Sequence, residues 1–286
     1  MHACNKNDKI QVVIYMKDKY LIVLDLDGTL LQGFDQYDLE TFAYLKQLAK
    51  QHTVVLATGR PYRSSKYYYD LLELTTPIIN YNGSLVHHPS DSKFKKQMHT
   101  VNKHDICNFL NELDSIFVNA FCEIEDSVYL FEDTKEMIPY LHLEGGTLTI
   151  GPFLTTLPSD PHGAILVTKE DSEEALLELS KKYSENSFHL RIWHNDDLVI
   201  SEVYSLHVNK ATGIKTIQEA LQIQDQKVIA IGDGHNDIEM IQYADIGVAM
   251  ANGHEELLEV ANYITSSLEE QGVMRFLKQF FKSKGQ

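Results

Sequence analysis

The chain has 286 residues, of which 43% are apolar and 23% are charged, and its formal net charge is −16. This length allows one large or two ordinary domains with a full hydrophobic core. The negative charge argues against binding to nucleic acid or to an anionic membrane surface. No apolar run approaches the roughly 18 residues of a membrane span. Three cysteines without metal-ligand spacing, and an early apolar segment too short for a secretory signal, favour the reducing cytoplasm.

The first 15 residues are polar and then briefly apolar, and they match no clear element. Met16–Lys19 leads directly into a strong strand pattern. Residues 1–15 are therefore interpreted as a possible N-terminal appendage.

A five-residue apolar run, Tyr20–Leu24, opens the folded part of the chain. Such a run suits a strand buried on both faces and is too short for a helix. Asp25 and Asp27 follow it, and Gly28 lets the backbone turn. Because Asp is costly to bury unpaired, the strand must end there, facing solvent or a cation. Ligands bind at this end in open α/β sheets, and Mg²⁺ would reconcile two carboxylates so close together.

Strands and helices then alternate through residue 84. The predicted elements are a helix capped by Asp38, a strand at 53–57, a helix from Pro61 through Leu74 and a strand at 77–81. The second strand stops at Thr58, Gly59 and Arg60, and the third stops at Asn82 and Gly83. This alternation indicates βαβ units and a parallel sheet.

The rhythm changes after residue 84 to a mixture of helices and antiparallel strands. The predicted elements are a hairpin at 84–88 and 93–99, a helix at 104–113, strands at 117–125 and 127–133, a helix at 173–183, and strands at 191–195 and 198–203. Residues 101–206 carry 20 acidic and only 6 basic side chains. Both observations favour an inserted second domain at 85–203, between two halves of a core domain at 1–84 and 204–286.

The parallel-sheet pattern returns at 227–231, which is again apolar and again ends in an acidic loop, at 232–237. The predicted elements after it are a helix at 238–243, a strand at 245–250, and helices at 254–263 and 272–281.

Four sites with chemically active side chains are predicted in loops just after, or beside, buried strands: Asp25 with Asp27, Thr58, Lys210, and residues 232–237. If the strands are parallel neighbours, these segments meet at one edge of the sheet. Carboxylates, a hydroxyl and a lysine are what phosphoryl transfer around Mg²⁺ requires. Considered alone, Thr58 is more often a capping hydroxyl and Lys210 a solvated lysine. The order and spacing of all four sites favour a functional role for both.

These segments are DLDGT at 25–29, ATGR at 57–60, HVNKATG around Lys210 and GDGHND at 232–237. They resemble the four ordered motifs of the haloacid dehalogenase (HAD) superfamily. The long insertion between the second and third motifs, and NYNGS at 80–84, resemble the Cof-type branch, subclass IIB, with its C2B cap. The resemblance covers the chain from about Tyr20 to the end. It implies an α/β fold, with a Rossmann-like parallel-sheet core and an inserted α+β cap domain.

The resemblance also implies roles for the matching residues. Asp25 would be the nucleophile that forms an aspartyl-phosphate. Asp27 would protonate the leaving oxygen and then deprotonate the hydrolytic water. The side chains of Asp25 and Asp233, with the backbone carbonyl of Asp27, would bind Mg²⁺. Thr58 and Lys210 would hold the phosphoryl group and complete the catalytic set.

The remaining positions support these groups or stay open. The resemblance gives Asn236 a phosphate contact, and it gives Asp237 the task of anchoring Lys210 or a metal-bound water. The predicted substrate- or phosphate-binding positions are Gly28, Gly59, Arg60, Asn82, Gly83 and Asn236. Arg60 would grip the substrate or cap the strand edge, while Asn82 and Gly83 would contact the leaving group or only make the turn into the insertion. For Trp193 and His194, core packing and a surface histidine are favoured over substrate contact.

Together these observations predict a Mg²⁺-dependent phosphatase that acts on a small phosphate ester, either a sugar phosphate or a nucleotide-like or cofactor-like monophosphate. The inserted domain would close over the site, and its acidity favours neutral or amine-bearing leaving groups. The alternatives are a sugar phosphomutase of the same branch and a non-catalytic metabolite-binding protein on the same scaffold. The oligomeric state is open, and a monomer is compatible with the sequence.

Overall fold

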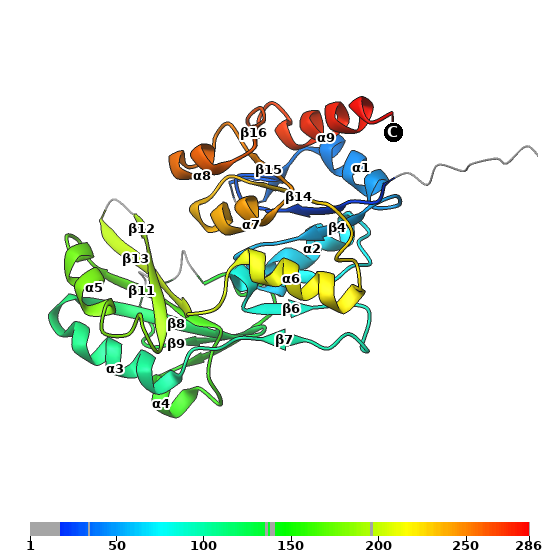
Figure 1. The fold of residues 1–286 in the computed structure, drawn as a ribbon. Helices are drawn as coiled ribbons and strands as arrows, with labels where there is room; N and C mark the ends of the chain where they lie inside the picture. Colours follow the sequence, from blue (N-terminus) through cyan, green and yellow to red (C-terminus); the bar gives the residue numbers. More distant parts are fainter. Residues whose placement is uncertain (1–17, 34, 135–136, 138–140, 195–196, 286) are drawn as a thin grey trace, which may run out of the picture.

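The computed structural model describes residues 18–33, 35–134, 137, 141–194 and 197–285. The interpretation of residues 1–15 as an appendage lies outside these residues. The described chain forms two bodies, a core built on a parallel sheet and a domain built on a mixed sheet, joined on one side (Figure 1). None of the helices in the described ranges combines the length and apolar character that a membrane span requires.

The core is organised by a five-stranded sheet of order β16-β15-β14-β1-β4, in which all neighbours are parallel. Its strands are β1 (Leu21–Leu24), β4 (Thr53–Leu56), β14 (Val228–Gly232), β15 (Ile246–Ala249) and β16 (Tyr263–Ile264). Leu24 of β1 lies opposite Leu56 on one side and Ile231 on the other. The three central strands therefore end at the same level, and the polar residues that follow them share one edge of the sheet.

Helices cover both faces of this sheet, which explains why its strands are apolar throughout. Ile22 and Leu24 pack with α1, α2 and α9, whereas Leu21 and Val23 pack with α6, α7 and α8 on the other face. The helices are α1 (Leu39–Leu48), α2 (Tyr62–Leu71), α6 (Lys210–Leu221), α7 (Ile238–Tyr243), α8 (Glu255–Val260) and α9 (Gly272–Ser283). Each fully buried aliphatic side chain contributes about 2 kcal/mol to the stability of the core.

The hairpin predicted at 84–99 is present, but it pairs with the end of the core. Its strands β6 (Leu85–His87) and β7 (Gln97–Met98) form an antiparallel sheet with β5 (Ile78–Asn80), and β5 is bridged to Ala57 beyond β4. Val86 belongs to the same hydrophobic cluster as Ile79, whereas Val101 belongs to the cluster of the inserted domain. We therefore propose that the inserted domain starts near Val101 rather than at residue 85.

The inserted domain has a six-stranded sheet of order β10-β9-β8-β11-β13-β12, antiparallel except between β9 and β10. Its strands are β8 (Phe117–Ile124), β9 (Ser127–Leu130), β10 (Thr147–Ile150), β11 (Gly163–Lys169), β12 (Phe188–His194) and β13 (Leu198–Ser205). Helices α3 (Lys103–Leu113), α4 (Phe153–Thr156) and α5 (Glu173–Ser180) cover the face turned away from the core (Figure 1). The opposite face is left to line the space between the domains.

The predicted α/β fold, a parallel-sheet core with an inserted α+β domain, is confirmed. Some elements differ from the prediction. Helix α2 ends at Leu71 rather than Leu74, because the backbone turns into the left-handed region at Glu73 (φ 50°). The strands β2 (Leu31–Gln32), β3 (Gln36–Tyr37), β10, β11 and β16 and the helices α4 and α6 were not predicted. The short antiparallel pair of β2 and β3, and three 3-10 turns at Tyr81–Gly83, Asp114–Ile116 and His235–Asp237, complete the described elements.

Candidate active site

The carboxyl end of β1 carries Asp25, which is buried against the ammonium group of Lys210. Lys210 Nζ lies 2.5 Å from Asp25 Oδ1 and 2.7 Å from Asp237 Oδ1, and it is fully buried. Burial opposes the charge on Lys210, but Asp237 and Asp25 outweigh that effect and raise its pKa above the ordinary value. The lysine is therefore a fixed cation beside the predicted nucleophile.

Lys210 was predicted in a loop, and this was wrong, because it is the first residue of α6. The side chain of Asn209 accepts the backbone N–H of Thr212 at 2.9 Å, and Thr212 Oγ1 accepts the N–H of Asn209 at 3.2 Å, which makes a capping box. Gly83 (φ 106°) packs against this helix start, where an added Cβ would lie 2.3 Å from Asn209 O. A rigid helix end therefore positions the lysine.

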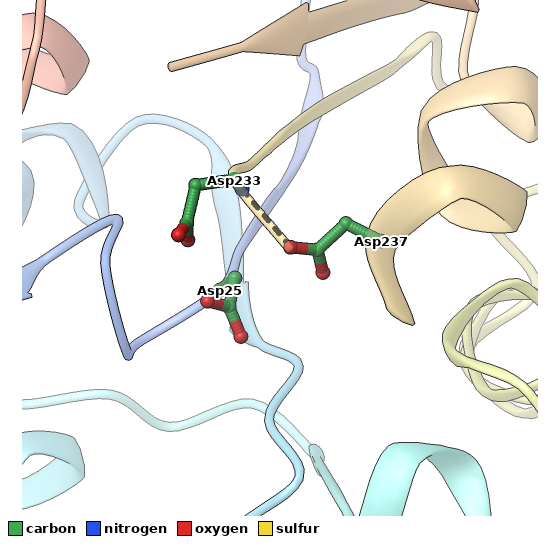
Figure 2. Close-up of side chains that lie close together, drawn as sticks. All are labelled: Asp25, Asp233 and Asp237. Carbon is green, nitrogen blue, oxygen red and sulfur yellow. Dashed lines mark hydrogen bonds between the residues drawn. The ribbon is translucent and has the colours of Figure 1, made fainter. Parts of the chain in front are cut away.

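The acidic loop after β14 brings Asp233 and Asp237 to the same place. Asp237 Oδ2 accepts the backbone N–H of Asp233 at 3.0 Å (Figure 2). The same oxygen accepts the N–H of Gly234 at 2.9 Å, while the other oxygen accepts from Lys210. Both oxygens of Asp237 thus have donors within the protein. This arrangement suits the predicted task of anchoring Lys210.

Asp25, Asp233 and Asp237 each present an oxygen within 4.8 Å of the others (Figure 2). Burial raises the pKa of Asp25 well above its usual range, and it raises that of Asp233 to about 6. Three crowded carboxylates with one lysine leave negative charge that a further cation would offset. All the donors are hard oxygens, so the site fits Mg²⁺, with Asp25 and Asp233 as the ligands less engaged by protein donors.

Gly28 makes room for this carboxylate group. Its backbone is left-handed (φ 77°), and an added Cβ would lie 2.0 Å from Asp233 Oδ2. Next to it, Thr29 Oγ1 donates to Asp233 Oδ1 at 2.7 Å, and Asn252 Nδ2 donates to Gly28 O at 2.9 Å. The sequence argument assigned no role to Thr29 or Asn252, although a hydroxyl ending the first acidic motif was an available signal for Thr29.

Arg60 binds the side chain of Asp27. Its Nε donates to Asp27 Oδ2 at 2.8 Å, and the two form an ion pair through Arg60 Nη2. The side chain of Arg60 is buried, whereas that of Asp27 is about half exposed. This contact differs from both alternatives weighed for Arg60. Because the Asp27 side chain is directed to Arg60, a metal contact of Asp27 through its backbone carbonyl stays a prediction.

The segments after β4 and β5 form the other wall. Thr58 is buried, and its Oγ1 accepts the backbone N–H of Arg60 at 3.1 Å. Asn82 Oδ1 accepts from Asn236 Nδ2 at 2.9 Å, and Asn82 Nδ2 donates to Glu202 of β13 at 3.2 Å. Asn82 thus links the core loops to the inserted domain.

A cavity of about 360 Å³ lies between the two domains, and we call it the active-site cavity. Six predicted residues line it, namely Asp25, Asp27, Gly59, Arg60, Asn82 and Asn236. Three more core residues also line it, Pro61, Arg63 and Ser64. The inserted domain contributes Phe121, Glu123, His142, Ile165, Trp193 and Ile200. Lys210, Asp233, Asp237 and Thr58 stand behind the lining or beside it. The site therefore has a charged floor from the core and a largely apolar roof.

Trp193 was expected to pack in a core, and that prediction is wrong. The side chain is 45% exposed and lines the active-site cavity. It lies opposite Ile200 on β13, and both residues line this cavity from the sheet face that α3 to α5 do not cover. The alternation of side chains along a strand does not reveal which face of the sheet packs against helices and which faces the other domain. The side chain of His194 lies outside the described part of the chain.

The comparisons with known proteins agree with this geometry. The family model of haloacid dehalogenase-like hydrolases matches residues 22–277. The 5-amino-6-(5-phospho-D-ribitylamino)uracil phosphatase YitU of Bacillus subtilis is 36% identical over 269 residues, which cover 92% of this chain and 97% of that protein. YcsE, a phosphatase of the same printed activity from Bacillus subtilis, is 27% identical over 268 residues, covering 92% and 96%.

Among solved structures, a HAD/COF-like hydrolase from Plasmodium vivax has the same fold. It superposes with a TM-score of 0.77 at 21% identity, covering 93% of this chain and 96% of that one. The inserted mixed sheet is consistent with a C2B cap, and we call it the cap from here on. The chain therefore belongs to the haloacid dehalogenase-like hydrolases, in their Cof-type branch, and it is a phosphatase.

Proposed function

We propose that this phosphatase hydrolyses 5-amino-6-(5-phospho-D-ribitylamino)uracil, or a close analogue, with Mg²⁺ and through an aspartyl-phosphate on Asp25. One observation carries the choice of substrate: the relative with that printed activity is 36% identical and aligns over 92% of this chain. The second relative with the same printed activity supports it. Such a substrate is a cofactor-like monophosphate with a neutral leaving group, which suits a cavity with a charged floor and an apolar roof.

In the proposed reaction, an oxygen of Asp25 attacks the phosphorus, and the bond from phosphorus to the ribityl oxygen breaks. Lys210 neutralises the charge between carboxylate and phosphate, while the Thr58 hydroxyl and the Asn236 amide hold phosphoryl oxygens. Asp27 donates a proton to the leaving ribityl oxygen. It then takes a proton from the water that attacks the phosphorus, which releases phosphate and restores Asp25.

Asp25 and Asp233, with the backbone carbonyl of Asp27, would hold Mg²⁺. When bound, the ion supplies positive charge that offsets the phosphoryl oxygens. Asp237 keeps Lys210 in place through the 2.7 Å contact, and Thr29 fixes Asp233 through the 2.7 Å contact. The protein contributes this pre-formed arrangement and the cap that excludes water.

The test is phosphate release by the full chain from phosphoribitylaminouracil, ribitol 5-phosphate, ribose 5-phosphate and flavin mononucleotide. The expected result is the highest kcat/KM for phosphoribitylaminouracil, with activity that EDTA removes and added Mg²⁺ restores. Hydrolysis that continues in the presence of EDTA would contradict the proposed requirement for Mg²⁺. A higher kcat/KM for one of the other esters would contradict the assignment of phosphoribitylaminouracil as the substrate. Isomerised product with little free phosphate would indicate a phosphomutase instead.

We also propose that the enzyme works in the cytoplasm. Both described cysteines, Cys107 and Cys122, are free thiols. Burial raises the pKa of both above the usual value, so they stay protonated and poorly reactive. Thiols of this kind suit a reducing compartment.

A further inference from the structure

A second, smaller cavity of about 60 Å³ adjoins the active-site cavity, and we call it the alcove. The two cavities share the lining residues Gly59, Phe121, Glu123, Ile165 and Trp193. The alcove adds four polar residues that the larger cavity lacks, Tyr81, Ser84, His162 and Glu202. A leaving group that extends from the phosphate site toward the cap therefore meets these side chains.

His162 is the most unusual of them. It is 2% exposed and stacks on Tyr81, with the ring centres 4.5 Å apart and the planes at 19°. Neither ring nitrogen makes a hydrogen bond of normal geometry in the described structure, although the backbone of His99 lies near enough to the ring to oppose the effect of burial on its pKa. Burial lowers its pKa to about 4, so near neutral pH the ring carries one donor and one acceptor. Leaving such groups unpaired in a buried position destabilises the free protein, and a bound partner would remove that penalty.

Glu202 supplies a carboxylate to the same cavity. Its side chain is 15% exposed, it accepts from Asn82 Nδ2 at 3.2 Å, and Arg191 Nη1 lies 3.8 Å from it. An ionised carboxylate accepts about four hydrogen bonds, so these contacts leave room for further donors. A carboxylate and a neutral imidazole lining one cavity complement an N–H beside a C=O, which is the lactam edge of a pyrimidine-dione.

The aromatic side chains offer the complementary flat surface. Trp193 is 45% exposed, and Phe121 lies on the same cavity wall. An exposed tryptophan beside a catalytic cavity provides a face for a planar ring, and stacking of this kind stabilises binding beyond the burial of apolar area. A sugar phosphate that carries no heterocyclic ring would use neither this aromatic face nor the polar groups that complement a lactam.

We infer that the alcove recognises the heterocyclic ring of the leaving group, with His162 and Glu202 bonding to its lactam edge and Trp193 stacking on its face. The inference rests on the proposed function and extends it, because it assigns specificity to His162 and Glu202, for which no role was predicted, and to Trp193, which was expected to pack in a core. These residues touch the leaving group and not the phosphate, so they affect the choice between substrates more than the chemical step.

The test compares kcat/KM for phosphoribitylaminouracil with kcat/KM for ribitol 5-phosphate, which has the same chain without the ring. His162→Phe keeps a ring on Tyr81 but removes both nitrogens, and Trp193→Ala removes an exposed side chain that the fold does not need. We expect each change to lower the ratio of the two kcat/KM values by about tenfold or more. His189→Phe is the control, because His189 is a cap-sheet histidine outside both cavities, and it should leave the ratio unchanged.

The outcomes separate the two claims. If the wild-type enzyme does not prefer the ring-bearing ester, the proposed function fails and this inference fails with it. If the wild type has the preference and both variants keep it, only the inference fails. Should His162→Phe not fold, as its ribitol 5-phosphate activity and thermal midpoint would show, the Trp193→Ala ratio decides alone.

Discussion

The side chain of Asp25 is buried, and its direct cationic partner in the described part of the chain is Lys210. Asp25→Asn keeps the size of the side chain and removes the attacking oxygen. We expect kcat to fall by about a thousandfold or more, equivalent to ~4 kcal/mol. The measurement is p-nitrophenyl phosphate hydrolysis at saturating Mg²⁺. Asp225→Asn, a change at an exposed aspartate, is the control, and a variant of Asp25 that retained a tenth of the activity would contradict the nucleophile assignment.

Two glycines near the first motif allow the steric effect of an added side chain to be distinguished from the strain of a left-handed backbone. Gly28 and Gly33 both have positive φ, at 77° and 61°, but only at Gly28 would a Cβ meet the carboxylate of Asp233. A side chain at Gly33 would have nothing within 4 Å. Gly28→Ala must therefore displace Asp233, whereas Gly33→Ala carries only a strain of about 1–2 kcal/mol.

We expect Gly28→Ala to raise the Mg²⁺ concentration needed for half-maximal activity and to lower kcat/KM by about a hundredfold. Gly33→Ala should lower the thermal midpoint and leave the Mg²⁺ dependence unchanged. Mg²⁺ titrations of the three proteins provide the measurement. Equal Mg²⁺ dependence in both variants would show that the space at Gly28 is unimportant.

The site residues that could be predicted from the sequence are those placed directly by the carboxyl end of one strand. The run before Asp25 and the run before Asp233 each predicted a buried strand with an acidic residue at its carboxyl edge, and the structure brings these residues within reach of one another. Trp193 and Glu202 were different, because their exposure depends on which face of the cap sheet meets the core. That choice is made by the pairing of two domains, and no local pattern records it.

Among the elements, α2 does more than cover the sheet. Arg63, in its first turn, is 5% exposed and extends into the cap, where its Nε donates to His142 O at 2.9 Å and its Nη1 to Glu125 O at 3.3 Å. It also forms an ion pair with Glu123, and Ser64 Oγ donates to Glu144 Oε2 at 2.7 Å. This end of α2 therefore ties the core to the cap at the rim of the active-site cavity.

Arg63→Met should weaken the closed arrangement of core and cap, because it leaves the largely covered Glu123 carboxylate, whose side chain is 15% exposed, without its cation. We expect kcat/KM to fall by about tenfold or more and amide exchange in residues 123–126 to accelerate. Lys66→Met is the matched control on the same helix, since Lys66 pairs with Asp70 at the exposed surface, where such pairs contribute little. Unchanged exchange in the Arg63 variant would remove the proposed tie.

The elements that could be predicted from the sequence are those with a simple pattern of burial. β1, β4 and β14 are apolar on both faces, and their runs predicted strands directly. β11 alternates between buried and partly buried positions at the centre of the cap sheet and was missed. The start of α6 depends on the capping box of Asn209 and Thr212 rather than on an apolar run. Side-chain capping and strand order are therefore where sequence reasoning fell short.

For the whole molecule, the balance of charge limits the substrates. The net charge is −16, and both arginines that line the active-site cavity already have carboxylate partners, Arg60 with Asp27 and Arg63 with Glu123. A second phosphate on the substrate would find no unshared arginine among the described lining residues. We expect fructose 6-phosphate to be hydrolysed with a kcat/KM about tenfold or more above that of fructose 1,6-bisphosphate. The opposite order would show that the cavity accommodates a second anion.

The stability of the whole molecule should depend on pH through its buried histidines. Burial, with a further contribution from Lys96, lowers the pKa of His87 from 6.5 to about 4. Between these two values the unfolded chain binds a proton that the folded protein does not, so the free energy of unfolding falls as pH decreases from 6.5 toward 4. His162 acts in the same direction, whereas Asp233, with its pKa raised to about 6, stabilises the folded state as pH falls.

His87→Gln isolates one of these contributions. Its amide can still bond to Asn80 Oδ1, which lies 3.2 Å from His87 Nε2, but it does not titrate. Urea unfolding of both proteins at about pH 7.5 and about pH 5 should show a smaller loss of stability in the variant. Asp233 and His162 are present in both proteins, so their opposing effects cancel in the comparison. An equal loss in both would mean that His87 is protonated in the folded state as readily as in the unfolded chain, which its burial against Tyr62 argues against.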